Sequence, residues 1–179
     1  KADMVELDIR QTKDGIPVIL HDACLERTTN GQGYLSKHTL AEIENLDAGY
    51  WFDPAGGQEY KMRGQGHYIP TFEKVVSQFP DRAFAVEIKE QSRDLIHRVI
   101  EILSKYDALA KAVVGSKYHK VSRVLRADFP EIPRFCSRVE IVKALWEFKR
   151  KIKNPAKDPL AFFSIPPTSF GIRLDSKGW

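Results

Sequence analysis

Two short stretches of the 179-residue chain decide its predicted fold: MVELDIR, residues 4–10, and FAVEIK, residues 84–89. In each stretch large apolar residues alternate with other types, as in a β-strand whose side chains point in turn to opposite faces of a sheet. Glu6 and Asp8 therefore share one face of the first strand, and Glu87 lies on the matching face of the second. The opposite faces carry apolar side chains and are suited to packing against helices.

The rest of the chain alternates between expected helices and strands. Helices are expected over residues 71–78, 93–105, 119–127 and 139–153, and further strands over 17–20, 112–115, 133–136 and 161–165. Strands that alternate with helices of this length form right-handed βαβ units around a parallel sheet. We therefore predict a fold of the α/β class.

Residues 22–68 form a different kind of segment, inserted after the short strand over residues 17–20. Glycines recur along it, the element Thr28-Thr29-Asn30-Gly31 lies near its start, and its only expected helix is a short stretch near residues 40–46. Segments of this composition run over protein surfaces and often carry function. We expect this insertion to cover a site and to contribute no core element.

Composition narrows the class of protein without naming a function. Apolar residues make up 42% of the chain and charged residues 29%, which is typical of a soluble globular protein. The net charge of +4 slightly favours anionic partners such as phosphate esters or acidic membrane surfaces. The sequence has no dense block of Lys and Arg with interleaved aromatic residues, so nucleic acid is not an expected partner.

The two cysteines indicate the redox state of the compartment in which the protein functions. Cys24 and Cys136 lie far apart, lack the CxxC spacing of a zinc site and adjoin apolar residues. We expect buried free thiols and a reducing compartment, and hence a cytoplasmic protein, with association at a membrane surface left open. The longest apolar run, residues 160–163, is too short to cross a bilayer.

The polar faces of the two strands predict a metal site. In a parallel barrel these faces point to the interior, and the carboxyl ends of the strands form the mouth of the active site. Glu6, Asp8 and Glu87 would repel one another there unless a cation lay between them. An oxygen-only set suits Mg²⁺ or Ca²⁺ better than zinc. The alternative, a half-exposed antiparallel sheet with a solvated polar face, is less favoured because both strands occur within a βα alternation.

Two further residues are candidates for catalysis. His21 ends the short apolar strand, where it can act as a general acid or base, although a lone His-Asp pair is more often structural. Lys89 lies one alternation beyond Glu87 and can supply positive charge to a phosphoryl transition state. The alternative for Lys89 is an ordinary surface lysine.

Three quoted elements resemble the glycerophosphodiester phosphodiesterase family: ADMVELDIRQTKDGIPVILHDACLERTTNGQG (2–33), IPTFEKV (69–75) and VEIK (86–89). The resemblance runs from residue 2 to about 136, and more loosely to 172. It implies a TIM (β/α)8 barrel that hydrolyses a glycerophosphodiester to an alcohol and a glycerol phosphate. The matched motifs imply these roles: Glu6, Asp8 and Glu87 as ligands of a divalent metal (Mg²⁺ or Ca²⁺), His21 as one of two catalytic histidines, Lys89 as the phosphate-binding lysine, and 22–68 as the family's insertion.

The chain also departs from the family pattern. The His-Arg and Glu-Asn pairs of the family's first strand and helix have no counterpart, and neither do the seventh and eighth strands. We expect a single partial barrel domain over residues 1–179, with about five of eight strands and the insertion after the family's second strand. Without the first catalytic histidine, we expect the isolated chain to be inactive.

The substrate and two other function classes stay open. Trp and basic residues in the expected helix over 139–153 suit a membrane surface and a lysophospholipid substrate, but an outer barrel helix with a solvated basic face is favoured. A small-molecule phosphodiester is the expected partner. One other class is a sphingomyelinase D-like phospholipase, against which the long insertion argues. The other is a non-catalytic phosphate- or lipid-binding remnant, which the missing histidine supports.

Overall fold

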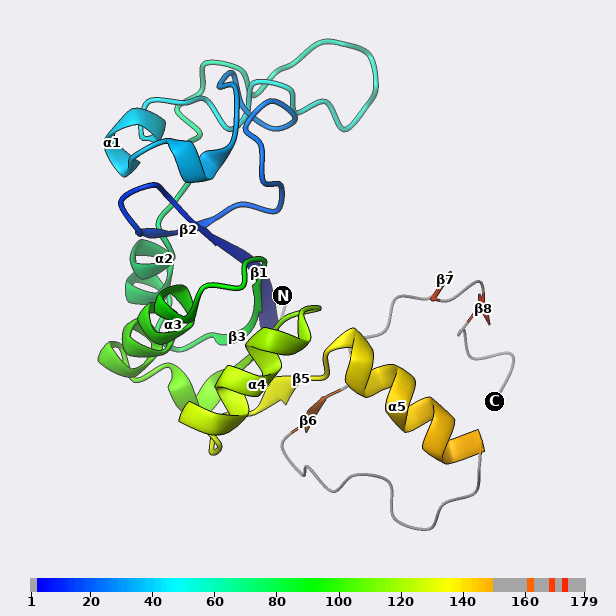
Figure 1. Cartoon of the computed structure of the whole chain (residues 1–179). Helices are drawn as coiled ribbons and strands as arrows, with labels where there is room; N and C mark the ends of the chain where they lie inside the picture. The colour runs from blue at the N-terminus through cyan, green and yellow to red at the C-terminus, as the bar shows by residue number, and fades with distance from the viewer. Residues whose placement is uncertain (1–2, 150–160, 163–167, 170–171, 174–179) are drawn as a thin grey trace.

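A computed structural model describes residues 3–149, 161–162, 168–169 and 172–173. Within these residues a six-stranded sheet has the strand order β2-β1-β3-β4-β5-β6 (Figure 1). Its strands are β1 (Met4–Gln11), β2 (Pro17–Ile19), β3 (Ala83–Ile88), β4 (Ala112–Gly115), β5 (Arg134–Phe135) and β6 (Ala161–Phe162). A separate antiparallel pair is formed by β7 (Thr168–Ser169) and β8 (Ile172–Arg173).

Five strands of the sheet, β1 and β3 to β6, run parallel to one another, as the sequence predicts for part of a barrel. The remaining strand, β2, pairs antiparallel with β1 through Ile9 and Ile19. The connection between β1 and β2 is too short for a parallel crossover, which needs a dozen or more residues. It turns at Gly15, whose φ of +78° is readily adopted only by glycine. The strand before the insertion therefore forms a hairpin at the edge of the sheet.

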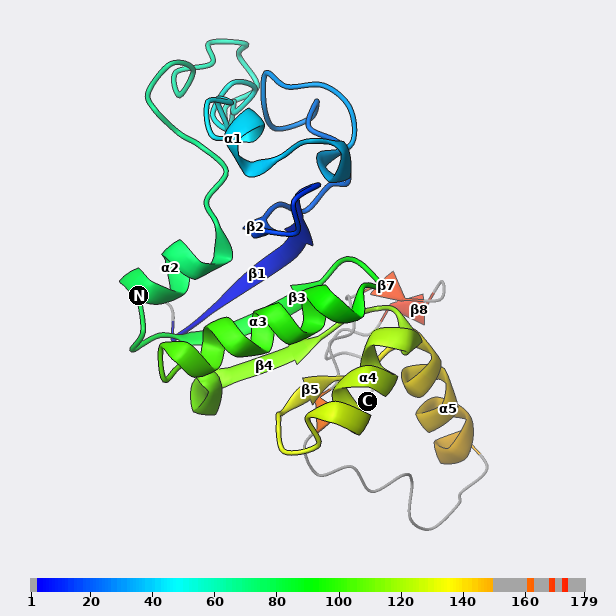
Figure 2. The same ribbon diagram turned by 60° about the vertical axis from the view of Figure 1, so that its left-hand side comes forward.

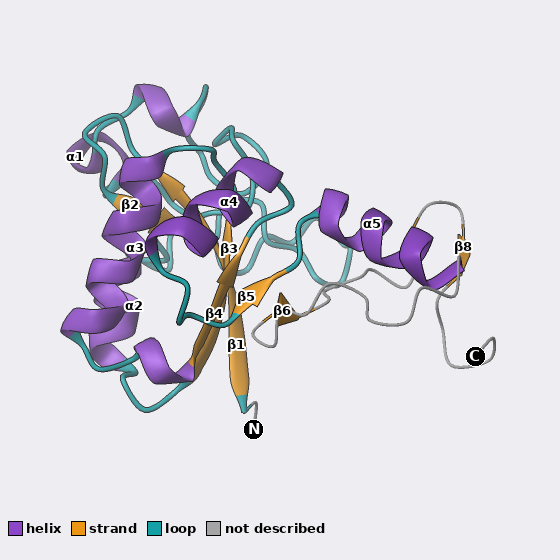
Figure 3. Cartoon of the chain, turned by 60° about the horizontal axis from the view of Figure 1, so that its bottom comes forward, coloured by secondary structure: helices purple, strands orange, loops and turns teal. Residues whose placement is uncertain are grey.

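Helices cover one face of this sheet (Figure 3). The helical elements are η1 (Leu35–Lys37), α1 (Leu40–Ile43), α2 (Phe72–Gln78), α3 (Arg93–Lys105), η2 (Leu109–Lys111), α4 (His119–Asp128) and α5 (Arg138–Lys149). The first turns of α2 and α3 are capped by Thr71 and Ser92, whose hydroxyls accept hydrogen bonds from the amides of Lys74 and Leu95. Both helices agree closely with their expected ranges, because a capping residue precedes each apolar run.

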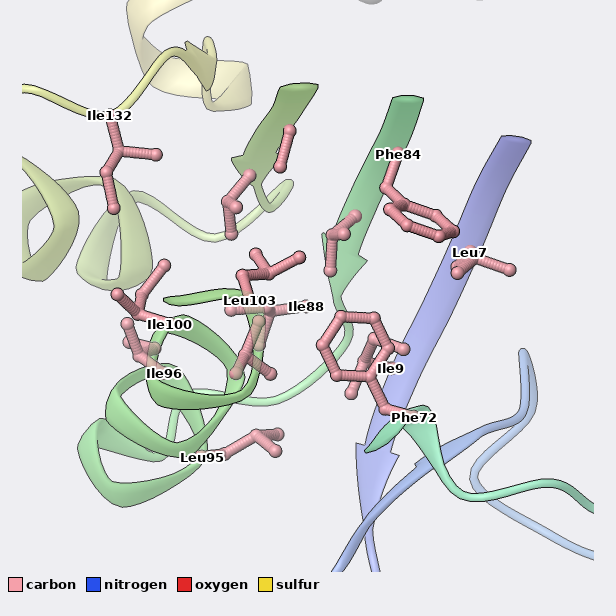
Figure 4. Packing of buried hydrophobic residues seen from close by; sticks show 14 of the residues in the cluster. Leu7, Ile9, Phe72, Phe84, Ile88, Leu95, Ile96, Ile100, Leu103 and Ile132 are labelled. Carbon is pink, nitrogen blue, oxygen red and sulfur yellow. The ribbon is translucent and has the colours of Figure 1, made fainter. Parts of the chain in front are cut away.

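The main core lies between the sheet and the helices α2, α3 and α4 (Figure 4). Its strand residues come from one face of each strand, as Ile9 on β1 and Phe84 and Ile88 on β3 illustrate. The matching face of α3 is fully apolar, with Leu95 and Leu103 buried against the strands. The predicted alternation is therefore confirmed, and the polar residues of β1 and β3 point away from this core.

The insertion, residues 22–68, extends beyond the carboxyl end of β1 (Figures 1 and 2). Contrary to the expectation that it adds no core element, it builds a small core of its own with the β2 hairpin. The buried members of this core are Val18, Leu20, Leu25, Leu35, Ile43 and Ile69. Its apolar residues follow no helical or strand period, which is why the sequence pattern did not reveal them.

The expected burial of both cysteines needs correction, and the helix expected over residues 139–153 is described only in part. Neither cysteine is in a disulfide, but only Cys136 is buried, whereas Cys24 is partly exposed. Helix α5 exposes Val139, Val142 and Trp146, each about half accessible. The last four residues of the expected helix, 150–153, lie outside the described part of the chain. None of the described helices is long and apolar enough to span a membrane.

A buried ion pair joins α4, β5 and α5. Glu140 accepts hydrogen bonds from the hydroxyls of Ser122 and Ser137, at 2.7 Å each, and from the guanidinium of Arg134 at 3.1 Å. Arg134 is only 4% exposed, so Glu140 supplies a counter-charge that water cannot replace. Burial acts to raise the pKa of Glu140, but these hydrogen bonds and Arg134 outweigh it and lower the pKa to about 2.

We predict that Glu140→Gln destabilises the protein by about 2–3 kcal/mol, because a charged hydrogen bond to the buried Arg134 is replaced by a neutral one. Since the folded pKa lies below the ordinary value of 4.5, this stabilisation is present above pH 4.5 and is lost as the pH falls towards 2. Urea unfolding at pH 7 and pH 3 measures both effects. The matched change Glu101→Gln, on the exposed face of α3, should leave stability unaltered. Equal unfolding of the two variants at pH 7 would contradict the prediction.

Candidate active site

Three carboxylates meet on the polar face of β1 and β3. Asp8 and Glu87 are direct register partners in the parallel pair, so their side chains point to the same side of the sheet. Glu6 lies two residues before Asp8 and shares that face. One ligand oxygen from each of the three lies within 4.8 Å of the others. The structure therefore brings together the three residues predicted to bind a metal.

Lys89 belongs to the same cluster and is not a surface lysine. Its ammonium lies 2.8 Å from Asp8 Oδ1 and 2.8 Å from Glu87 Oε2, and its side chain is only 9% exposed. Burial acts to lower the pKa of Lys89, but the bonds to Asp8 and Glu87 outweigh it and raise the pKa. Three carboxylates and one ammonium leave two negative charges when all are ionised, which is the charge that a divalent cation neutralises.

Glu6 shows the effect of this excess negative charge. Partial burial, and then repulsion and hydrogen bonding from Asp8, raise the pKa of Glu6 above its ordinary value. Lys89 opposes this shift without cancelling it. A cation among the three carboxylates would favour their ionised forms, and carboxylate oxygens are the donors that Mg²⁺ and Ca²⁺ prefer. The residues present thus fit a divalent metal.

His21 follows the short edge strand β2, which pairs with β1. The amide of Leu20 donates to the carbonyl of Asp8 at 3.0 Å, so the residue before His21 is bonded to the backbone of a member of the carboxylate cluster. The imidazole of His21 is 63% exposed, and its Nδ1 lies 2.6 Å from Asp22 Oδ1. An exposed ring that is paired through one nitrogen is free to react through the other, Nε2.

Two arginines that sequence patterns did not single out hold this histidine. The guanidinium of Arg27 binds the second oxygen of Asp22, and the bonds from Arg27 and then His21 lower the pKa of Asp22 to about 2. Arg10 donates from Nε to the carbonyl of His21 at 2.9 Å. The sequence could have indicated that Arg10 lies on the same face as Glu6 and Asp8, because it continues their alternation along β1. Nothing in the spacing of Asp22 and Arg27 indicates their pairing.

Fold and site together define the class. A partly built parallel α/β barrel, with three carboxylates and a lysine near the carboxyl ends of two neighbouring parallel strands, is a partial TIM barrel. The sequence profile of the glycerophosphoryl diester phosphodiesterase family matches residues 1–135. The chain belongs to this family, as its motifs predicted.

Individual relatives agree with this membership. The chain is 40% identical over 114 residues to a glycerophosphodiester phosphodiesterase of Bacillus subtilis, which covers 62% of the chain and 39% of the relative. It is 32% identical over 181 residues to one from Caldanaerobacter subterraneus, covering 96% of the chain and 70% of the relative. The solved structure of an Oleispira antarctica phosphodiesterase in complex with the product sn-glycerol-3-phosphate is also similar. It has 34% identity and a TM-score of 0.61, and the match covers 74% of this chain and 53% of that one.

We predict that Lys89→Met lowers the free energy of unfolding by about 2 kcal/mol in chelator, less than the ~3–5 kcal/mol of a fully buried pair because Asp8 and Glu87 keep some exposure. Mg²⁺ or Ca²⁺ should raise the melting temperature of this variant more than that of the unaltered protein, since the cluster then carries three negative charges. Thermal melts with chelator and with each ion measure this. Lys105→Met, which removes an exposed partner of Glu73, is the control. An ion response no larger than that of the control would count against a metal site.

Proposed function

We propose that the protein hydrolyses a glycerophosphodiester, with a divalent cation, to an alcohol and a glycerol phosphate. The observation that carries the proposal is the cluster of Glu6, Asp8 and Glu87, on the paired strands β1 and β3, around Lys89. The edge strand β2, which precedes His21, pairs with β1. The product-bound Oleispira relative supports a small glycerol phosphodiester as the substrate. Because the chain spans 39% of its Bacillus subtilis relative, this activity is proposed for the full-length protein.

Each residue of the cluster has a role that its position suggests. Glu6, Asp8 and Glu87 would hold Mg²⁺ or Ca²⁺, which when bound supplies Lewis-acid polarisation of a phosphoryl oxygen and helps to orient the nucleophile. The ammonium of Lys89 borders this site and offsets negative charge on the phosphate oxygens. The nucleophile is a water molecule or the 2-hydroxyl of the glycerol.

His21 moves a proton through Nε2. Because Nδ1 is bonded to the Asp22 carboxylate, the neutral ring carries its proton on Nδ1 and leaves Nε2 as the acceptor. The family resemblance implies that a second histidine shares the acid and base roles. Among the described residues the other histidines bond elsewhere or lie in the insertion, as His97 does with Asp128 and His119 with Ser137. We therefore propose that the 179 residues alone show no turnover.

We predict that Glu87→Gln in the full-length protein lowers metal-dependent turnover about 100-fold or more, because one anionic ligand is lost. Release of glycerol phosphate from glycerophosphocholine is measured with Mg²⁺, with Ca²⁺ and with chelator. Lysophosphatidylcholine, which presents the same phosphodiester on an acylated glycerol, is the second substrate. Glu101→Gln makes the same chemical change on an exposed helix face and should keep full activity.

The outcomes of this assay separate the function classes. Full metal-dependent turnover by Glu87→Gln would refute the ligand assignment. Cyclic phosphate as the final product would favour the sphingomyelinase D-like class. A full-length protein that folds and binds substrate, but releases no product with either ion, would be the non-catalytic remnant.

We predict that Asp22→Asn lowers turnover about 10- to 100-fold, because the imidazole loses the carboxylate that orients it and stabilises its charged form. Asp22 is ionised at neutral pH, since its pKa is about 2. Asp81→Asn, at a side chain that is 98% exposed, is the matched control. An unchanged rate would remove Asp22 from the proposed mechanism.

The proposal extends to the location of the protein and to its surface contacts. The thiols of Cys24 and Cys136 are compatible with a reducing compartment, and we propose a cytoplasmic protein. The half-exposed side chains of Val139, Val142 and Trp146 on α5 suit contact with a membrane surface or with a further part of the barrel.

A further inference from the structure

The insertion contains a cavity that the proposed chemistry does not use. Its volume is about 210 Å³, and it opens among residues from the start and the middle of the insertion. The residues that give it chemical character are Arg27, Trp51, Phe52, Asp53 and Pro54. Cavities that hold drug-sized ligands have about 300–1,000 Å³, so this one suits a smaller group.

The cavity is linked to the candidate active site by one side chain. Arg27 lines the cavity and also binds Asp22, whose other oxygen holds the ring of His21. Asp22 therefore joins this wall residue to the proposed catalytic imidazole.

The lining of the cavity is aromatic and anionic. Trp51 and Phe52 are 46% and 53% exposed, so neither ring is consumed by packing into a core. Asp53 adds a carboxylate, whose Oδ2 is fixed by a 2.6 Å hydrogen bond from the amide of Gln58. The positive charge of Arg27 is already offset by its ion pair with Asp22. Aromatic faces beside a carboxylate attract cations, and alkylated ammonium groups above all.

The aromatic wall is held in place before any ligand arrives. The ring of Trp51 makes edge contacts with Tyr50 and Tyr60, at centroid distances of 4.7 and 5.7 Å. The guanidinium of Arg63 lies 3.9 Å from the Tyr50 ring and 4.4 Å from the Tyr60 ring, closer than its 5.2 Å from Trp51. Arg63 thus contacts all three rings of this aromatic group, and a wall that is already ordered loses little conformational entropy on binding.

We propose that this cavity binds the alkylated ammonium group of the substrate's leaving alcohol, so that the protein prefers phosphodiesters of cationic amino alcohols to those of neutral polyols. The inference rests on the proposed function for its link to turnover. Recognition of the ammonium group itself depends only on Trp51, Phe52 and Asp53.

The first test is binding of choline alone to the full-length protein, measured by titration calorimetry. We expect a saturable response to choline and none to glycerol. Asp53→Asn, which keeps an oxygen for the Gln58 amide, should weaken choline binding about tenfold, while Glu59→Gln, an exposed change in the same insertion, should not. Equal responses to choline and glycerol, or equal affinities of the two variants, would overturn the inference.

The second test is the ratio of kcat/KM for glycerophosphocholine to that for glycerophosphoglycerol. Asp53→Asn should lower this ratio about tenfold, chiefly through KM, because the residue meets the alcohol and not the phosphate. Hydrolysis of both substrates without any choline binding would overturn the cavity inference and leave the proposed function standing. Choline binding without hydrolysis would support the cavity and overturn the proposed function.

Discussion

The parallel pairing of β1 with β3 is the constraint on which the site depends. Its register sets Asp8 opposite Glu87, and the pleat then places Glu6 and Lys89 on the same face. A slip of one residue in either strand would turn that strand's polar side chains into the helix layer and its apolar ones outward. The core residues Ile9 and Ile88 hold the register, because both are fully buried on the opposite face. The packing of apolar side chains on one face of the sheet thus fixes the positions of the charged side chains on the other face.

Lys89 connects the stability of the site with its chemistry. It bridges Asp8 and Glu87 at 2.8 Å each, so two of the carboxylates are held close together although their charges repel. The third, Glu6, has no such bridge among the described residues, and its partial burial, followed by repulsion from Asp8, raises its pKa. The arrangement is stable enough to form in advance, yet it keeps the charge that attracts a divalent cation. Pre-formed geometry of this kind is what a catalytic cluster requires.

Regular periodicity made the main elements predictable from sequence. Alternation identified β1 and β3 with their faces, and the cap at Ser92 together with the apolar stripe of α3 gave the bounds of that helix. The candidate site followed, because its carboxylates lie on those strands. Interactions without a period did not follow. The pairing of Asp22 with Arg27 depends on how a loop returns on itself, and the small core of the insertion joins residues whose spacing obeys no repeat.

The β2 hairpin has one further consequence. Val18 packs into the small core of the insertion, while its neighbour Ile19 packs against the main core. The strand β2, which precedes His21, therefore lies between two hydrophobic clusters and contacts both. A cluster of six buried residues opens at a lower free energy than the larger one. Local opening of the insertion would release His21 from its anchor while the sheet stays folded. The placement of His21 therefore depends on packing in both hydrophobic clusters and not on the sheet alone.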